Sequence, residues 1–470
     1  MSIRAAIVGV ALVLVGCDAK NENSCLDGTC SDPARPYCDT DGFFSGTEGL
    51  CIQVACTANE FERCIGAEAQ VCNDDGTNYR SVECPNGCGP TGCIGNPGCT
   101  TNAQCNNPNP VCDTSNKTCR MCTRNEECSS TLCEQGSCIA ESSVVYASPG
   151  GAASGNCAQA TPCTLTRATT IASSAANGIL RLLPGTYTDS LVVSNSTTLT
   201  VYGKGATLVG GTGLLSVKAG DVIVRDVVVQ STPVTAEGIQ CGATSNTPPL
   251  PKCTFRDVMN TGAIAVYNGE AHFYGYRHLN GAVRVDDDGS LLMDRAFLDC
   301  PACTSGPADF VATRQRLRVY VTNSVLVNFW PQFNTMDLAT TNQVKFAYST
   351  LVVTQGSAGI GPFVCGNSAS YAQVGQLENN IIVAPSGIDA VVGSRCTTTN
   401  NVLFPQSTAR PGNIIADPQF ENQAAKDFRP RTTSPARNAA MPGTVTTDHD
   451  YTGAMRPQGG GADIGAYEIP

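Results

Sequence analysis

Apolar and polar residues alternate in short runs along most of the chain between residues 191 and 412. These runs begin near residues 199, 222, 253, 271, 291, 317, 344, 375 and 398, so their starts lie 18 to 31 residues apart. Alternation with a period of two indicates β-strands with one buried face, and Gly, Asn or Asp at the breaks indicates turns. Strands that recur at this spacing predict a β-solenoid of roughly nine or ten coils, stacked at about 4.8 Å.

Asparagine recurs at one place relative to the apolar runs. Asn323, Asn379-Asn380 and Asn400-Asn401 each precede a stretch of Val, Ile or Leu. Equivalent positions of successive coils lie above one another, so amide side chains there can donate and accept hydrogen bonds along the stack. We expect a structural ladder at a turn rather than a binding site.

Residues 144–190 have a different pattern. A strand near residues 142–146 and a Gly/Ser-rich turn precede apolar residues at helical spacing, namely Leu165, Ala168, Ile171, Ala172 and Ala175. The strand ILRLLPGTY follows at 179–187. A short helix followed by this strand resembles the N-terminal cap of pectin-lyase-like proteins, and a cap would cover the open strand edges and core. The resemblance implies an all-β chain with a right-handed parallel β-helix, whose coils we place at 191–412.

The segment 25–138 lacks hydrophobic periodicity and holds 18 of the 27 cysteines. The cysteines group as four at 25–51, six at 56–93, and four each at 99–119 and 122–138, the last two beginning CTTNAQC and CTRNEEC. Disulfides stabilise small modules that lack a sizeable core, and this density predicts an oxidising compartment. The connectivity within each group stays open. Zinc is an alternative for Cys84-x3-Cys88-x4-Cys93 and Cys119-x2-Cys122, but the first histidine of the chain is His272.

Eight further cysteines lie in the second part of the chain and form neighbouring pairs in the sequence. Proximity predicts disulfides between Cys157 and Cys163, Cys241 and Cys253, Cys300 and Cys303, and Cys365 and Cys396.

The first residues have the pattern of an export signal. Arg4 precedes an apolar run from Ala5 to Gly16 that is too short to span a bilayer. Leu14-Val15-Gly16-Cys17 resembles the lipobox of bacterial lipoproteins, which implies cleavage before Cys17 and lipidation of that residue. Several acyl chains would give stable anchoring. We expect a signal peptide at 1–16, a lipidated tether at 17–24, and a linker at 139–143; a plain secretory signal is the alternative.

The segment 413–470 contains an ordered set of short motifs. These are Asp417-Pro418-Gln419-Phe420, Asp448-His449-Asp450, Arg456-Pro457 and Asp463-Ile464-Gly465-Ala466-Tyr467-Glu468. They resemble the choice-of-anchor Q domain that ends bacterial β-helix proteins, a family without a settled catalytic role. We expect a cap that closes the last coil, with Asp463 and Glu468 in local hydrogen bonds.

Charge is unevenly placed along the chain. The net charge is −11, and residues 18–143 hold 18 Asp and Glu against 7 Lys and Arg. The rest of the chain is close to neutral, so there is no basic footprint for a nucleic-acid partner. The acidic Cys-rich segment would act as a soluble stalk.

The best candidate for catalytic chemistry lies between residues 284 and 295. It comprises Arg284, Asp286, Asp287, Asp288, Asp294 and Arg295. A polysaccharide lyase or glycoside hydrolase needs converging carboxylates or a Ca²⁺ site, and Asp286–Asp288 can supply oxygen ligands. Adjacent strand residues point opposite ways, however, and Asp-Asp-Asp-Gly is more simply a turn. The NTD, GHG and RIK signatures of polygalacturonases do not occur.

Two strands present candidate binding rows. Period-two alternation places His272, Tyr274, Tyr276 and His278 on one face. If Leu317, Val319 and Val321 face inward, then outward positions go to Arg314, Arg316, Arg318 and Tyr320. Arginine pairs with carboxylate or sulfate, and aromatic rings stack on sugars. A solvated face, with arginines paired to Asp of adjacent coils, is the alternative.

These patterns favour a non-enzymatic lipoprotein of the bacterial outer membrane or cell surface. Its stalk would project the β-helix, and the long side would contact a glycan or another surface partner. A lyase or hydrolase of pectin-lyase-like fold and a structural envelope protein without a ligand remain alternatives. No cofactor is expected apart from Ca²⁺ at the aspartates, and the sequence indicates no oligomeric state.

Overall fold

The computed structural model describes residues 37–39, 50–52, 56, 59–73, 79–84, 87–94, 99–195, 197–243, 248–286, 288–303, 308–313, 317–332, 343–354, 361–365 and 375–470. The predicted signal peptide and tether, Cys17, Asp287, Arg314 and Arg316 lie outside these residues. The chain divides into two units, 1–54 and 55–470. In the first unit, strands β1 (Tyr37–Asp39) and β2 (Leu50–Ile52) pair antiparallel. The second unit contains everything discussed below.

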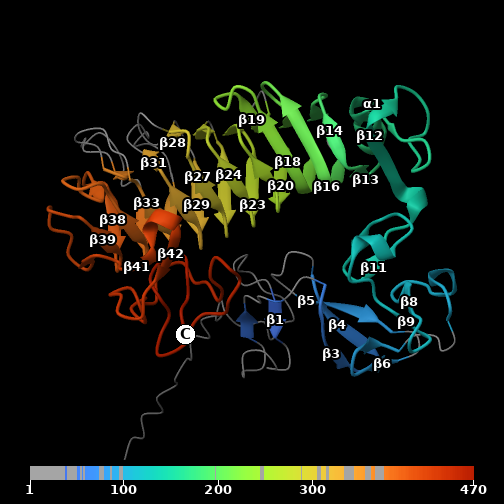
Figure 1. Ribbon diagram of the computed structural model, residues 1–470, viewed down its shortest axis with the longest axis horizontal. Coiled ribbons are helices and arrows are strands. Elements are labelled where there is room, and N and C mark those ends of the chain that lie inside the picture. The colour runs from blue at the N-terminus through green and yellow to red at the C-terminus, as the bar shows by residue number, and fades with distance from the viewer. Residues whose placement is uncertain are drawn as a thin grey trace, which may run out of the picture. The chain divides into compact units, whose positions relative to one another are not determined.

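From Val144 onward, the strands form two long parallel sheets (Figure 1). Within the described residues, one sheet has twenty strands and the other has nine. One coil consists of β23 (Glu270–Tyr274) and β24 (Arg277–Leu279) in the first sheet and β25 (Val283–Asp286) in the second. Each of these strands pairs in parallel with its equivalent in the next coil. The predicted fold class, a parallel β-helix preceded by a small disulfide-rich region, is confirmed.

The strands begin close to the predicted positions. Those that match the nine sequence runs are β16 (Thr198–Gly210), β18 (Asp221–Ser231), β20 (Lys252–Arg256), β23, β26 (Ser290–Asp294), β29 (Arg318–Thr322), β32 (Gln343–Ala347), β35 (Gly375–Glu378) and β38 (Cys396–Thr399). The other strands of this sheet are β12 (Val144–Ala152), β13 (Asn177–Leu182), β14 (Gly185–Tyr187), β21 (Met259–Asn260), β24, β27 (Phe297–Asp299), β30 (Val325–Val327), β33 (Thr350–Val352), β36 (Ile381–Val383), β39 (Val402–Phe404) and β40 (Ile414–Ile415).

The nine-stranded sheet contributes one strand to each coil, in agreement with the predicted coil number. Its strands are β15 (Leu191–Val193), β17 (Leu215–Val217), β19 (Glu237–Gly242), β22 (Ala263–Tyr267), β25, β28 (Ala308–Thr313), β31 (Phe329–Gln332), β34 (Phe363–Val364) and β37 (Val391–Val392).

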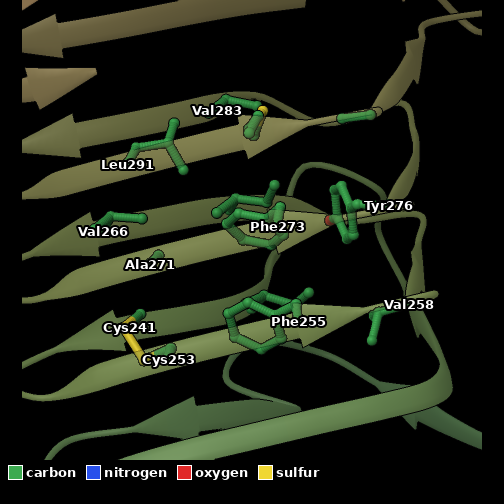
Figure 2. Packing of buried hydrophobic residues seen from close by; sticks show 14 of the residues in the cluster. Cys241, Cys253, Phe255, Val258, Val266, Ala271, Phe273, Tyr276, Val283 and Leu291 are labelled. Atoms are coloured by element: carbon green, nitrogen blue, oxygen red, sulfur yellow. A yellow bond between two sulfur atoms is a disulfide. The ribbon is translucent and has the colours of Figure 1, made fainter. Parts of the chain in front are cut away.

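The core is a column of inward side chains that stack coil upon coil. Figure 2 shows Phe255 of β20 next to Phe273 of β23 in the stack, with Tyr276 beside them. The ring centroids of Phe255 and Phe273 lie 4.7 Å apart. The Cys241–Cys253 disulfide crosses the interior between β19 and β20. All four predicted disulfides of the β-helix are confirmed. Buried aromatic area and these crosslinks together hold the stack.

Helix α1 (Leu165–Ala172) lies at the start of the β-helix, as the helical spacing predicts (Figure 1). Leu165, Ala168 and Ala172 are buried in the main core. The Thr164 hydroxyl accepts a hydrogen bond from the backbone N–H of Arg167 and so caps the helix. The helix therefore covers apolar side chains that the first coil would expose. None of the helices in the described part of the chain has the length and apolar character needed to cross a bilayer.

The Cys-rich modules are small hairpins closed by disulfides. The six-cysteine group holds β3 (Phe61–Ile65), β4 (Glu68–Cys72), β5 (Tyr79–Glu83), β6 (Cys88–Gly89) and β7 (Gly92–Cys93). The two repeats hold 3-10 turns at Asn102–Gln104 and Asn125–Glu127, with hairpins β8 (Val111–Asp113)–β9 (Thr118–Arg120) and β10 (Cys133–Glu134)–β11 (Ser137–Cys138).

The disulfides described between residues 56 and 138 stay within the cysteine groups. The pairs are Cys56–Cys72, Cys64–Cys88 and Cys84–Cys93, then Cys99–Cys112 and Cys105–Cys119, then Cys122–Cys133 and Cys128–Cys138. The two repeats thus share one pattern, first to third and second to fourth. The zinc alternative is wrong, because every cysteine proposed for it is oxidised.

The last module, residues 122–138, packs directly on the β-helix. The Tyr202 hydroxyl donates to the Glu134 carboxylate at 2.6 Å, and Arg225 forms an ion pair with Glu134 at 3.3 Å. Leu132 joins a buried apolar cluster with Tyr146 and Tyr202. The expectation of a stalk that projects the β-helix is therefore wrong for this module, which is part of the same packed body.

The C-terminal segment, residues 416–470, lies along the side of the coils. Phe420 of β41 (Phe420–Asn422) and Phe428 of β42 (Asp427–Pro430) belong to a buried cluster with outward side chains of four coils, namely Val325, Val352, Ile381 and Val402. The backbone N–H of Ala466 donates to the Thr350 hydroxyl at 3.0 Å. The predicted cap over the last coil is thus wrong in position, because only β40 continues the stack on β39.

The predicted local hydrogen bonds of this segment are confirmed. Asp463 accepts from the backbone N–H groups of Asn438 at 2.6 Å and Ile469 at 2.7 Å. Glu468 forms a fully buried ion pair with Arg456 at 2.9 Å. Arg456 also donates to the backbone carbonyls of Asp463 and Gly465. Its guanidinium therefore holds the last residues of the chain in place.

The predicted asparagine ladder is confirmed for Asn379-Asn380 and Asn400-Asn401 and extends further. It is wrong for Asn323, whose side chain donates to Asp294 and Thr447 instead. The Asn401 side chain accepts from the side chain of Asn380 at 2.9 Å and donates to that of Asn413 at 2.8 Å. The backbone N–H of Ser324 donates to the Ser349 hydroxyl at 3.2 Å, and the backbone N–H of Ser349 donates to the Asn380 side chain at 3.0 Å. A parallel pair joins Asn400 to Asn379 at 2.7 Å.

Replacing Asn401 by Ala should lower the free energy of unfolding by roughly 2–4 kcal/mol, because it leaves buried groups of Asn380 without a partner. Denaturation followed by circular dichroism measures this loss. Thr399→Ala, an exposed change two residues away, is the control and should cost under about 1 kcal/mol. An equal loss of unfolding free energy in the two variants would contradict a stabilising role of the ladder.

Candidate functional site

Strands β20, β23, β26, β29 and β32 present a continuous surface, which we call the outer face. Strand register aligns its side chains in three rows. The rows are Lys252, Glu270, Ser290, Arg318, Gln343; then Thr254, His272, Leu292, Tyr320, Lys345; then Arg256, Tyr274, Asp294, Thr322, Ala347. Equivalent residues of neighbouring coils lie about 4.8 Å apart, so each row is a straight array of side chains.

The predicted outward placement of the first row is correct for two of its four members. His272 and Tyr274 lie on the outer face, whereas Tyr276 and His278 are buried in the core, with exposed fractions of 1% and 0%. Gly275 adopts φ +58° and turns the chain between β23 and β24, which resets the alternation. Burial lowers the pKa of His278 to about 4, so this side chain is a neutral core group.

The predicted outward placement of the second row is confirmed where the structure describes it. Leu317, Val319 and Val321 are buried, Arg318 is exposed, and Tyr320 is half-buried. The Tyr320 hydroxyl donates to the side chain of Gln343, and the Lys345 ammonium lies 5.8 Å from the Tyr320 ring centroid. Ring and cations thus form one surface across two coils.

Charges on the outer face differ in how they are compensated. A His272 ring nitrogen lies 2.5 Å from the Glu270 carboxylate, and its hydrogen bond is the main cause of the lowered pKa of Glu270. Arg256 lies over the Tyr274 ring at 5.0 Å. By contrast, no carboxylate of a described residue lies within ion-pair distance of Arg318 or Lys345. These two cations are the ones available to an anionic ligand.

The described members of the aspartate set do not converge. Asp286 ends β25 and Asp288 has φ +52°, with the Gly289 N–H donating to the Asp286 carbonyl at 3.1 Å. This is the turn that the sequence favoured. Asp294 and Arg295 lie at the far end of β26, about 13 Å along the strand. Arg284 of β25 lies 3.8 Å from Glu237 of β19, and both strands belong to the nine-stranded sheet. The candidate catalytic group is therefore split between two ends of a strand.

Potential metal ligands of the described residues gather closely only in two cysteine sets. These are Cys99, Cys105 and Cys119, and Cys122, Cys128 and Cys133. All six sulfurs are in disulfides, so they offer no thiolate to a metal.

Sequence reasoning missed a buried cluster that joins the coils to the C-terminal segment. Nε2 of His449 lies 3.0 Å from the Asp294 carboxylate, and Nδ1 lies 2.9 Å from that of Asp448. Asp294 also accepts hydrogen bonds from Thr322 at 2.7 Å and Asn323 at 2.9 Å. His449 is only 3% exposed, so the cluster is closed to ligands and serves attachment. The Asp-His-Asp motif was visible, but nothing local indicated a partner 155 residues away.

Comparison with known proteins does not assign this chain to a family. No family model matches the sequence, and no curated protein matches it. Among solved structures, the crystal structure of pectate lyase Pel9A resembles this chain with a TM-score of 0.41 and 14% sequence identity, covering 70% of this chain and 96% of that one. The fold assignment rests on the strand pairing of this chain itself.

The His449 cluster predicts a pH-dependent stability. Burial alone would lower the pKa of His449, but hydrogen bonds and charges of Asp294 and Asp448 outweigh it and raise that pKa to about 9. The stabilisation is therefore complete below about pH 6.5 and is lost as the pH rises through about 9. The rise from 6.5 corresponds to on the order of 3 kcal/mol.

His449→Gln should accordingly unfold more easily than the parent protein near neutral pH and lose this difference above about pH 10. Urea denaturation of both proteins across this range measures it. His272→Gln, which removes an ion pair on the outer face, is the matched control and should change stability by under about 1 kcal/mol. A difference for His449→Gln that stays constant with pH would contradict the charged cluster.

Proposed function

We propose that this protein is an exported, lipid-anchored bacterial surface protein that binds acidic polysaccharide along its outer face. The observation that carries the proposal is the pair of cations, Arg318 and Lys345, without carboxylate partners among the described residues, beside the Tyr320 ring. Arginine recognises carboxylate and sulfate groups through paired hydrogen bonds, and the tyrosine ring offers an apolar surface to a sugar.

The shape of the outer face suits an extended polymer. Its rows run straight across five coils, from Lys252 to Gln343 in the first row. At the C-terminal end, Thr444 donates its hydroxyl to Gln376 at 3.3 Å and its N–H to Glu378 at 2.7 Å, so the C-terminal segment covers the next coil. The accessible length of the face is therefore bounded.

Binding is a better fit than catalysis by the candidate aspartates. A hydrolase needs two carboxylates about 5 to 9 Å apart, whereas Asp286 and Asp288 lie at the other end of β26 from Asp294. Export is supported by the disulfides, since the described residues alone contain at least eleven. The anchor is proposed from the sequence around Cys17.

Arg318→Ala and Tyr320→Ala should each weaken binding to an acidic polysaccharide by about three- to tenfold, because each removes one contact of the row. A glycan array identifies the polymer, and titration of the variants measures the loss. Thr397→Ala, on an exposed position beyond the covered coil, is the control. Absence of binding to every glycan, or unchanged affinity in both variants, would refute the proposal.

Cys17→Ser should abolish incorporation of labelled fatty acid when the chain is expressed in a lipoprotein-processing bacterium, and should move the protein from the membrane to the soluble fraction. Lys20→Ala, three residues later, is the control and should stay labelled and membrane-bound. A membrane-bound, labelled Cys17→Ser protein would contradict anchoring through this residue.

A further inference from the structure

Among the described residues, the nine-stranded sheet ends at β37, and the last strand of a sheet presents a row of backbone groups to any further strand. β37 bonds to the preceding coil through the carbonyls of Ala390 and Val392, which accept from the N–H groups of Phe363 at 3.2 Å and Cys365 at 2.8 Å. In a parallel strand, the N–H and carbonyl of the residue between them point to the opposite side. Val391 therefore directs both of its backbone groups toward the open edge.

The side chain of Gln406 takes the place of a further strand. The Val391 N–H donates to Gln406 Oε1 at 3.0 Å, and Gln406 Nε2 donates to the Val391 carbonyl at 3.3 Å. A primary amide has the same donor and acceptor as a peptide group, so it reproduces both hydrogen bonds of a neighbouring strand. Arg410 adds hydrogen bonds to the carbonyls of Val391, at 3.2 Å, and Gly393. Gln406 is only 9% exposed, so water has little access to these bonds.

The loop that carries these side chains, residues 405–413, is itself fixed to the last coil. The Asp389 carboxylate accepts from the backbone N–H groups of Ser407 at 2.5 Å and Thr408 at 3.1 Å. At the end of the loop, Asn413 Oδ1 accepts from the backbone and side chain of Asn401, and Asn413 Nδ2 donates back to carbonyls within the loop. We call residues 405–413 the edge cap, because the nine-stranded sheet and the asparagine ladder both end on its side chains.

Beside the edge cap, this end of the β-helix keeps apolar side chains at its surface. Ile415 of β40 continues the inward position of Leu403 and is 47% exposed, and Phe404 is 37% exposed. The opposite end of the β-helix carries helix α1, which covers its core (Figure 1). The surface of a second copy that fits this end is therefore the same end of that copy, in a two-fold symmetric contact.

We propose that the edge cap blocks strand addition at β37 and so prevents two copies of the chain from associating through their last coils. An uncovered strand edge beside exposed Ile and Phe side chains favours such pairing. The edge cap removes the hydrogen-bonding part of this contact, and the apolar side chains that remain are far fewer than a stable interface needs. The inference concerns assembly and does not depend on the polysaccharide contacts proposed above.

The test is sedimentation velocity of the full-length chain over a series of concentrations, in a Cys17→Ser background so that no lipid contributes to association. The parent protein should be monomeric. Gln406→Leu frees both backbone groups of Val391, and this variant should dimerise with a dissociation constant at least about tenfold lower than that of the parent. Gln423→Leu makes the same exchange at an exposed position of the C-terminal segment and should stay monomeric.

Two further variants separate release of the edge from loss of stability. Adding Ile415→Lys to Gln406→Leu places a charge at the same end and should restore the monomer, whereas it does not rescue a protein that aggregates because it is unfolded. Arg410→Ala leaves Gln406 in place and frees the Gly393 carbonyl, so it should shift the protein toward the dimer more weakly. Circular dichroism checks that each variant is folded.

Three results would each overturn the inference: a dimeric parent protein, a folded Gln406→Leu protein that stays monomeric, or a dimer that Ile415→Lys does not reverse. If Gln406→Leu does not fold, a monomeric Arg410→Ala protein overturns it instead.

Discussion

The parallel register between coils governs the rest of this structure. Each residue of a strand lies about 4.8 Å from its equivalent in the next coil, so the chain must place compatible side chains on top of one another. Inside, this is met by apolar stacks such as Phe255 on Phe273. At the turns it is met by amides, because a group that is both donor and acceptor can bond to a copy of itself, as Asn380 does to Asn401.

Charged side chains cannot satisfy the same constraint among themselves. Stacked copies of Arg225 and Arg256 repel, and a buried carboxylate such as Asp294 needs a counter-charge. Part of the counter-charge comes from the coils, since Arg295 lies 3.6 Å from the Asp294 carboxylate. More of it comes from outside the coils, because Glu134 of the last Cys-rich module approaches Arg225 and His449 of the C-terminal segment approaches Asp294. The two segments that are not part of the solenoid thus each add an opposite charge to a charged group of the coils.

How far the sequence predicts this arrangement depends on the range of the interaction. Strand positions, the disulfide Cys241–Cys253 and the Asn379-Asn380 ladder follow from local periodicity and were predictable. Tyr276 and His278 were misplaced, because the turn at Gly275 resets a two-residue period that the sequence continues without a break. The contact between His449 and Asp294 spans 155 residues and has no local signature.

The same constraint explains where binding chemistry would lie on the outer face. Where acidic and basic side chains are neighbours on the outer face, as with Glu270 and His272, they pair with each other and are less available to a ligand. Where cations have no carboxylate of a described residue within ion-pair distance, as at Arg318 and Lys345 beside the Tyr320 ring, they are accessible to an anionic ligand. An exposed cation is hydrated in the free protein, so the outer face keeps it at little cost in stability until a carboxylate or sulfate group replaces the water.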